Sequence, residues 1–155
     1  MNRRIDTAMT WIEATPERIY EAFLDKEELV KWLPPEGMSA RAPVFEPWIG
    51  GVYQLELTYE TENGASGKTT AQTDVSNGRF VELVPGQKIV QIGTFDSTDP
   101  DFAGEMVQTW YLEALDGGTR VTIVCENVPS GIRKQDHDAG LRSTLDNLAH
   151  YLTND

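Results

Sequence analysis

One histidine is the residue of this sequence with the widest range of possible catalytic and binding roles. His137 precedes Leu141 by four residues, and residues four apart share a helix face, so it lies on one stripe with Leu141 and Leu145. In that position a histidine could act as a general base or orient a ligand, with Asp136 or Asp138 beside it. The alternative is a partly exposed histidine at a helix start, hydrogen-bonded to the preceding loop.

Polar and aromatic side chains could line a pocket that this histidine faces, since they lie on strands in which buried and exposed residues alternate. Tyr53 and Trp110 lie on the buried parity of their strands, and each joins an aromatic body to a polar atom that could orient an apolar ligand. Gln108 shares the parity of Trp110, and a buried amide needs hydrogen-bond partners. The remaining aromatic candidates are Trp32, Trp48 and Phe80. The alternative is a filled aromatic core with Gln108 near the end of the sheet.

Two further residues share the parity of the last strand. Asn127 would face inward just before the final loop, where it could meet His137 or satisfy the loop backbone. Cys125 has apolar neighbours and no basic residue close in sequence, so we expect an inert core thiol.

Other residue patterns could suggest a phosphate or metal site, but they do not meet the requirements of such a site. Gly67-Lys68-Thr69 resembles the end of a phosphate-binding loop, but Glu62 stands where that motif needs glycine. Neighbouring helix residues point about 100° apart, so Asp136, His137 and Asp138 cannot reach one ion. A single cysteine and two histidines cannot build the usual structural zinc site either. We predict no metal and no cofactor.

The elements that must position these residues follow a simple order. Residues 3–14 predict a strand, Thr15 and Pro16 begin a helix, and Asp25 begins a second short helix. A period of two then predicts strands at 41–45, 53–59, 79–84, 88–95, 106–112 and 121–125. Residues 68–76 fit a solvated strand or an extended loop. The chain closes with a helix from Lys134 or Asp136 to Thr153 that carries a leucine stripe.

Composition and charge exclude several classes of protein. The 155 residues predict a single domain spanning 1–155, without a linker or repeat. The 25 acidic and 13 basic side chains give a net charge of −12, which repels phosphate backbones and anionic lipids. We therefore expect no nucleic-acid partner and no membrane. No signal-peptide pattern follows the N-terminus, which predicts a cytoplasmic protein. Acids fall on loops, helix starts and outward parities, so we expect a nearly uncharged interior.

Six segments in order resemble one known superfamily: residues 12–23, 29–33, 47–51, 80–90, 116–122 and 126–151. The chain resembles the START-related superfamily, also called SRPBCC or Bet v 1-like. Within it, the chain resembles the branch named after the activator of the 90-kilodalton heat-shock chaperone's ATPase. The resemblance implies an α+β helix-grip fold, in which a curved antiparallel sheet of about six to seven strands wraps around the long C-terminal helix. It also implies a cavity between sheet and helix, and two short helices after the first strand.

Three functions fit this resemblance. The first is a module that binds a small apolar or aromatic molecule, more neutral than ionic, in the cavity. The second is a cyclase- or hydrolase-type enzyme in which His137 is the general base and Tyr53 the acid or oxyanion donor. The third is a chaperone-interacting domain with a filled core and an exposed apolar patch. Both a monomer and a homodimer are compatible with the sequence. The ligand-binding candidates are Trp32, Trp48, Tyr53, Phe80, Gln108, Trp110, Asn127, His137, Leu141 and Leu145.

Overall fold

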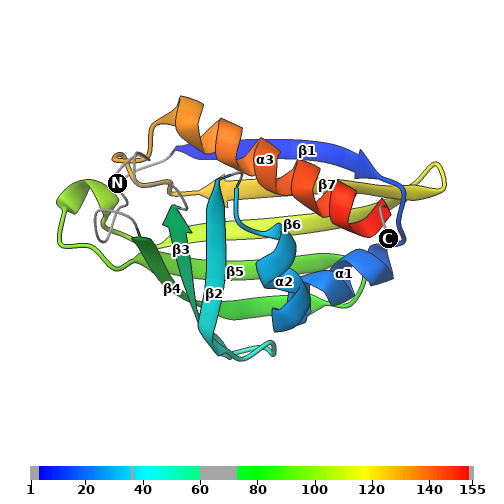
Figure 1. Ribbon diagram of the computed structural model, residues 1–155, viewed down its shortest axis with the longest axis horizontal. Coiled ribbons are helices and arrows are strands. Elements are labelled where there is room, and N and C mark those ends of the chain that lie inside the picture. Colours follow the sequence, from blue (N-terminus) through cyan, green and yellow to red (C-terminus); the bar gives the residue numbers. More distant parts are fainter. Residues whose placement is uncertain (1–3, 36, 60–72, 154–155) are drawn as a thin grey trace.

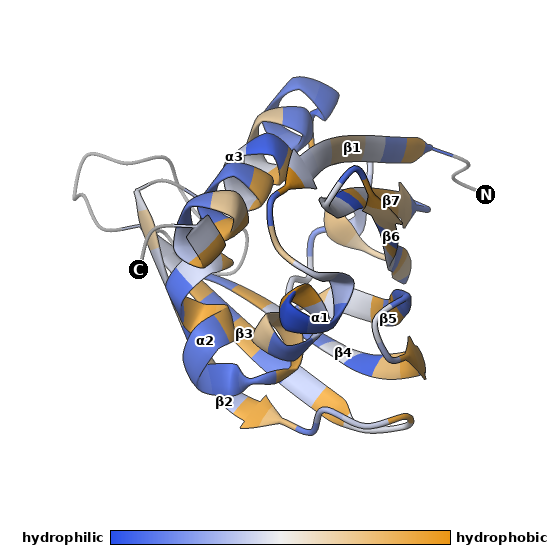
Figure 2. Ribbon diagram, turned by 90° about the vertical axis from the view of Figure 1, so that its right-hand side faces the viewer, coloured by the Kyte–Doolittle hydropathy of each residue, from blue (hydrophilic) through white to orange (hydrophobic). Residues whose placement is uncertain are grey.

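The protein folds as a single curved antiparallel sheet whose concave face holds three helices (Figures 1 and 2). The computed structural model describes residues 4–35, 37–59 and 73–153. The seven strands lie in the order β1-β7-β6-β5-β4-β3-β2. They are β1 (Ile5–Ile12), β2 (Met38–Phe45), β3 (Val52–Tyr59), β4 (Thr73–Val84), β5 (Lys88–Phe95), β6 (Met106–Leu115) and β7 (Gly118–Glu126). The helices are α1 (Pro16–Leu24), α2 (Lys26–Trp32), α3 (Lys134–Thr153) and the short 3-10 turn η1 (Pro100–Phe102). The predicted α+β helix-grip fold is confirmed.

Local capping signals start the first two helices where the sequence predicts them. The Thr15 side chain accepts a hydrogen bond from the Arg18 amide at 3.1 Å, and Pro16 occupies the first turn of α1. Asp25 accepts from the amides of Glu27 and Glu28 at the start of α2. The two helices therefore follow each other with a single residue between them.

The last hairpin shows how turn chemistry fixes the register of the sheet. Asp116 and Gly117 link β6 to β7 with φ of 51° and 80°, the positive pair that a two-residue hairpin turn requires. The register that follows pairs Trp110 with Ile123 and Gln108 with Cys125. Directly paired residues point to the same face, so this turn decides which side chains of both strands face α3.

An aromatic cluster fills one end of the concave side. The rings of Phe23, Trp32 and Trp110 contact one another edge-on or tilted, with centroids 4.9 to 5.8 Å apart. The indole of Trp32 also donates to the Ala22 carbonyl at 3.2 Å. This part of the interior is a packed core, and α1 and α2 contribute its helical side.

Three details of the sequence prediction need correction. Residues 73–76, left open between strand and loop, are the first part of β4. The strand predicted at 41–45 begins earlier, at Met38. The interior is not free of charge, because the carboxylates of Asp6 and Asp74 are buried within it.

The pattern at Gly67-Lys68-Thr69 lies outside the described residues. No helix in the described part of the chain is long and apolar enough to span a membrane.

Candidate ligand cavity beneath the C-terminal helix

A cavity of about 220 Å³ lies between the sheet and the first half of α3. Its walls are mainly apolar and include Leu29, Leu55, Leu57, Met106 and Leu141. The volume exceeds the ~150 Å³ that accommodates benzene, and it is smaller than the ~300–1,000 Å³ of pockets for drug-sized ligands. The space therefore suits a molecule of one or two rings.

One row of paired residues carries two polar side chains of the cavity wall and two more beside it. Asp6 on β1 pairs with Cys125 on β7, Cys125 with Gln108 on β6, and Gln108 with Gln91 on β5. Because paired residues share a face, all four side chains point to the concave side. Adjacent strands lie ~4.8 Å apart, so the row extends roughly 14 Å from Asp6 to Gln91. We call these four residues the polar row.

The neighbouring row of pairs forms a trough that holds a tyrosine. Tyr53 pairs with Gly78, Gly78 with Gly93, and Gly93 with Met106. A Cβ atom at Gly78 would lie 2.3 Å from the Tyr53 Oη, and one at Gly93 would lie 3.2 Å from it. Two glycines side by side are therefore what lets the Tyr53 ring lie across β4, with its hydroxyl between β4 and β5.

Two of the polar side chains in the cavity wall make no hydrogen bond. Tyr53 and Gln91 are 8% and 7% exposed, and both line the cavity. Within residues 4–35, 37–59 and 73–153, neither the Tyr53 hydroxyl nor the Gln91 amide has a side-chain hydrogen-bond partner. Burial raises the pKa of Tyr53, so the hydroxyl keeps its proton and can donate. The cavity thus offers the Tyr53 hydroxyl and the Gln91 amide to a bound molecule, and the hydroxyl side chains of Ser76 and Thr94 also belong to its wall.

Gln108, by contrast, is occupied by its neighbours. Its Oε1 accepts from the Trp110 indole at 2.8 Å, and its Nε2 contacts the Cys125 Sγ at 3.4 Å. Burial raises the pKa of Cys125 to about 11, so the thiol is protonated at neutral pH. Gln108 therefore fixes the middle of the polar row, and the indole of Trp110 is not available to a ligand.

At the β1 end of the row, a buried carboxylate holds the histidine of α3. The His137 Nδ1 lies 2.7 Å from Asp6 Oδ2, and the Asp6 side chain is completely buried. Arg4 donates to both carboxylate oxygens, at 3.1 and 2.8 Å, and also to the Ile132 carbonyl. The Arg4 hydrogen bonds lower the pKa of Asp6 to about 2 and outweigh the opposing effect of burial, and His137 lowers it further.

This arrangement fixes the tautomer of His137. An ionised carboxylate can only accept hydrogen bonds, so the proton between the two groups must belong to His137 Nδ1. In its neutral form the imidazole carries its lone pair on Nε2. His137 lines the cavity, with a side chain that is 13% exposed.

Four of the predicted site residues meet at the cavity: Tyr53, Gln108, His137 and Leu141. Four others lie in the packed core outside it: Trp32, Phe80, Trp110 and Leu145. Phe80 supports the cavity indirectly, since its ring packs against Tyr53 with centroids 5.3 Å apart.

Two predicted residues lie elsewhere. Trp48 is 57% exposed at the turn between β2 and β3, where the Gly50 amide donates to the Phe80 carbonyl, and it does not line the cavity. Asn127 has a φ of 60° and donates to the Glu105 carbonyl at 2.7 Å, so its amide satisfies loop backbone and does not pair with His137.

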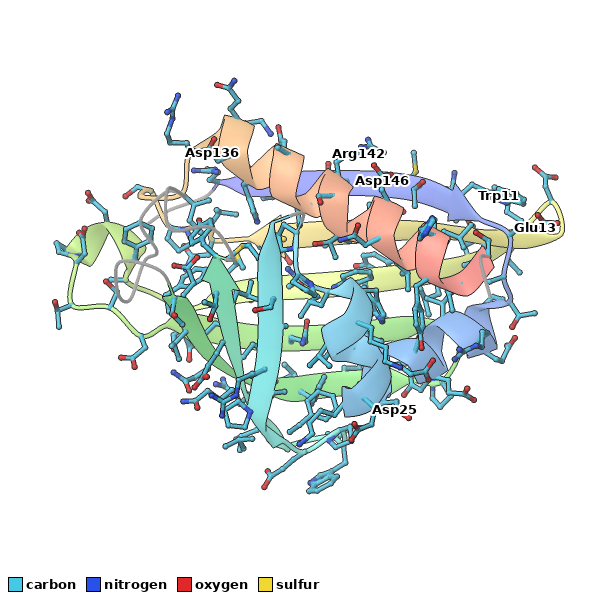
Figure 3. All side chains as sticks on the ribbon, viewed as in Figure 1. Trp11, Glu13, Asp25, Asp136, Arg142 and Asp146 are labelled. Carbon is cyan, nitrogen blue, oxygen red and sulfur yellow. The ribbon has the colours of Figure 1, made fainter. Side chains whose placement is uncertain are left out.

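The partners expected for His137 also differ from those observed. Asp136 is exposed at the start of α3, as Figure 3 shows, and Asp138 bonds to Lys134. The histidine pairs with Asp6, which is distant in sequence. Nowhere in the described ranges do three His, Cys, Asp or Glu side chains come together to hold a metal ion.

Sequence reasoning missed Asp6 and Gln91. Asp6 lies on the same parity as Ile12, so a strand with that face buried would have placed a carboxylate inside. Gln91 lies on the parity of Ile89, which is buried in β5. Both signals depend on knowing which face of the strand is covered. A short strand with apolar residues at both odd and even positions does not reveal which face that is.

A curved sheet gripping a C-terminal helix, with a small cavity between them, defines a protein of the Bet v 1-like class, a fold consistent with a ligand-binding module. Residues 13–153 match the family model described as activator of Hsp90 ATPase homolog 1-like protein. The chain belongs to this family.

Solved structures agree with the assignment. Protein CV1439 from Chromobacterium violaceum is 32% identical, with a TM-score of 0.87 over 97% of this chain and 98% of its own. Ms6760 from Mycobacterium smegmatis, at 16% identity and a TM-score of 0.75, covers 100% of this chain and 98% of its own. An AHSA1-like protein from Aeromonas hydrophila, at 14% identity and a TM-score of 0.73, covers 96% of this chain and 92% of its own. The last two show the fold alone. Among curated proteins there is no match.

Proposed function

We propose that this protein binds a small, uncharged and largely apolar or aromatic molecule in the cavity beneath α3. The observation that carries the proposal is the pair of unpartnered polar groups, the Tyr53 hydroxyl and the Gln91 amide, in an apolar wall. No fully buried side-chain nitrogen or oxygen in the described part of the chain lacks a hydrogen-bond partner, so these two groups are reachable from the cavity, and a bound molecule can pair with them directly.

Charge on the cavity wall supports a neutral ligand. The negative charge of Asp6 is already balanced by Arg4, which donates to both of its oxygens. Tyr53, Gln91 and Gln108 are uncharged, His137 is already paired with Asp6, and the rest of the wall is mainly apolar. An ionic ligand would lose its hydration without gaining an opposite charge, which is strongly unfavourable.

The test is a binding assay with named one- and two-ring probes. Indole, 2-naphthol, 2-tetralone and quinolin-2-one are titrated into the isotope-labelled chain, and amide shifts are followed by NMR. We expect at least one probe to perturb residues of β5 and the first half of α3 and to raise the melting temperature. Saturable shifts confined to other surfaces, or none with any probe, would contradict the proposal.

Two variants distinguish the contribution of the polar groups to binding from that of the apolar wall. Gln91→Leu and Tyr53→Phe each remove one hydrogen-bonding group while keeping most of the side-chain volume. We expect each to weaken a hydrogen-bonding probe by about 3- to 10-fold, which corresponds to one hydrogen bond. In the absence of a probe, Gln91→Leu should unfold at a higher temperature, because an apolar side chain is more stable than an amide in a mainly apolar wall. Trp48→Ser, at the exposed turn, is the matched control and should leave binding unchanged.

The chaperone-interaction alternative predicts a filled core, and the cavity favours the small-molecule interpretation over it. The surface feature that a chaperone-interacting domain could use is the exposed turn with Trp48 and Ile49, which are 57% and 63% exposed. Nothing in the described residues indicates which partner such a turn would contact.

A further inference from the structure

His137 has the arrangement of a general base. Its Nδ1 donates to the buried Asp6 carboxylate, and its Nε2 makes no hydrogen bond to the described residues of the cavity wall it belongs to. Arg4 holds Asp6 by two hydrogen bonds and is itself anchored on the Ile132 carbonyl, so the carboxylate cannot turn away from the ring. A carboxylate-oriented imidazole with a free Nε2 can take a proton from a bound molecule.

Hydrogen-bond donors line the same cavity on other strands. Gln91 lies on β5 in the row that runs to Asp6, which holds His137 above β1, whereas the Tyr53 hydroxyl lies farther from β1, between β4 and β5. The Gln91 amide has no side-chain hydrogen-bond partner among the described residues, so it can turn toward an oxygen atom of a ligand. Preorganised donors of this kind stabilise an oxygen on which negative charge develops.

The cavity lacks the nucleophile that acyl transfer would need. Cys125 is buried and contacts the Gln108 amide. Ser76 lies on β4, with three strands between it and the β1 strand that holds His137, and makes no hydrogen bond to the histidine among the described contacts. A base next to a nucleophile is the signature of covalent catalysis, and it is missing in the described residues.

We propose that the cavity catalyses reversible proton transfer at the carbon next to the carbonyl group of a small neutral ketone. This inference rests on the proposed binding function. His137 Nε2 takes the proton as the C–H bond breaks, and that electron pair forms a C=C bond while the carbonyl becomes an enolate oxygen. Gln91 donates to this oxygen, and Asp6 balances the imidazolium charge. Return of the proton to carbon restores the ketone, so no oxidant, reductant or second substrate is consumed.

Hydrogen–deuterium exchange tests the step without knowledge of the natural substrate. The probe is 2-tetralone in D₂O at neutral pD, and NMR follows the loss of its α-proton signals with the full chain or with an equal concentration of free imidazole. We expect the protein to exceed imidazole by at least 10-fold and His137→Gln to lose most of that excess. His150→Gln is the matched control, since His150 is exposed on the same helix, and should exchange like the parent chain.

Binding is measured in the same samples, which separates two kinds of failure. If 2-tetralone binds in the cavity but exchanges no faster than with imidazole, or if His137→Gln exchanges as fast as the parent, the proton-transfer inference is overturned and the binding function stands. If neither 2-tetralone nor any other probe binds, the proposed function fails, and this inference with it.

A second measurement covers the case in which His137→Gln does not fold. 2-Naphthol resembles the planar enol form of the probe, and a site built for the enolate should bind it more tightly than the ketone. We expect 2-naphthol to inhibit exchange by the unmodified chain competitively, and its binding to shift the His137 Nε2 resonance. Exchange that persists when 2-naphthol saturates the cavity would overturn the inference.

Discussion

Replacing Asp6 with asparagine tests the electrostatic core of the cavity. Hydrogen bonds from Arg4, which outweigh the cost of burial, and from His137 lower the pKa of Asp6 from 3.8 to about 2. Because the pKa is lower in the folded chain than in the unfolded chain, the ionised carboxylate stabilises the fold at neutral pH. That stabilisation is present above about pH 4 and is lost as the pH falls through about 2.

The size of the effect follows from the size of the shift. A lowering of this extent corresponds to about 2 kcal/mol of unfolding free energy at pH 7, of which roughly half remains at pH 3. Asp6→Asn should therefore lose about 2–4 kcal/mol at pH 7, the upper value including the cost of leaving Arg4 without its partner. The penalty should shrink by about 1 kcal/mol at pH 3. Urea denaturation at pH 7, 5, 4 and 3, followed by tryptophan fluorescence, measures both values.

A matched control isolates the contacts of Asp6 with Arg4 and His137 as the cause. Asp136→Asn removes an exposed carboxylate near the same histidine, and we expect a change within ~0.5 kcal/mol at every pH. A penalty for Asp6→Asn that stays constant from pH 7 to pH 3 would refute the linkage between this carboxylate and stability. A variant as stable as the parent would refute the structural role of the Arg4–Asp6–His137 contacts.

Three further predictions follow from single features. Burial raises the pKa of Cys125 to about 11, so an aromatic disulfide reagent at pH 8 should modify it only after the chain is unfolded by urea. Gly78→Ala places a Cβ atom 2.3 Å from the Tyr53 Oη, so we expect a loss of about 1–3 kcal/mol in urea denaturation and weaker binding of 2-naphthol. Trp48→Ser should change the unfolding free energy by less than ~0.5 kcal/mol, and a larger loss would mean that this side chain packs against the fold.

The fold could be predicted because its signals are local. Thr15 and Pro16 start α1, and Asp25 starts α2, through contacts that span two or three residues. The turn at Asp116 and Gly117 fixes a hairpin through two backbone angles. Each of these signals can be recognised in a short stretch of sequence, without knowledge of what packs against it.

The candidate site could be predicted only in part, because its geometry depends on contacts between distant segments. His137 was recognised from its helix face, but its partner Asp6 is 131 residues away. Tyr53 was recognised from its parity, whereas the trough that directs its hydroxyl comes from Gly78 and Gly93 on two other strands. Trp48 was expected at the cavity because its residue type suits a pocket, and only the turn geometry places it outside.

The polar row explains how one sheet can both stabilise the fold and leave room for a ligand. Its members differ in what they contact: Asp6 is bound by Arg4 and His137, and Gln108 is bound by Trp110 and Cys125. Only Gln91, at the far end of the row, has no side-chain partner among the described residues. A chain selected for stability alone would favour an apolar residue there, since an apolar side chain is more stable than an amide in a mainly apolar wall. The unpaired amide therefore points to binding as the reason for a polar residue at this position, and the opposite effects expected of Gln91→Leu on stability and on binding test that reason directly.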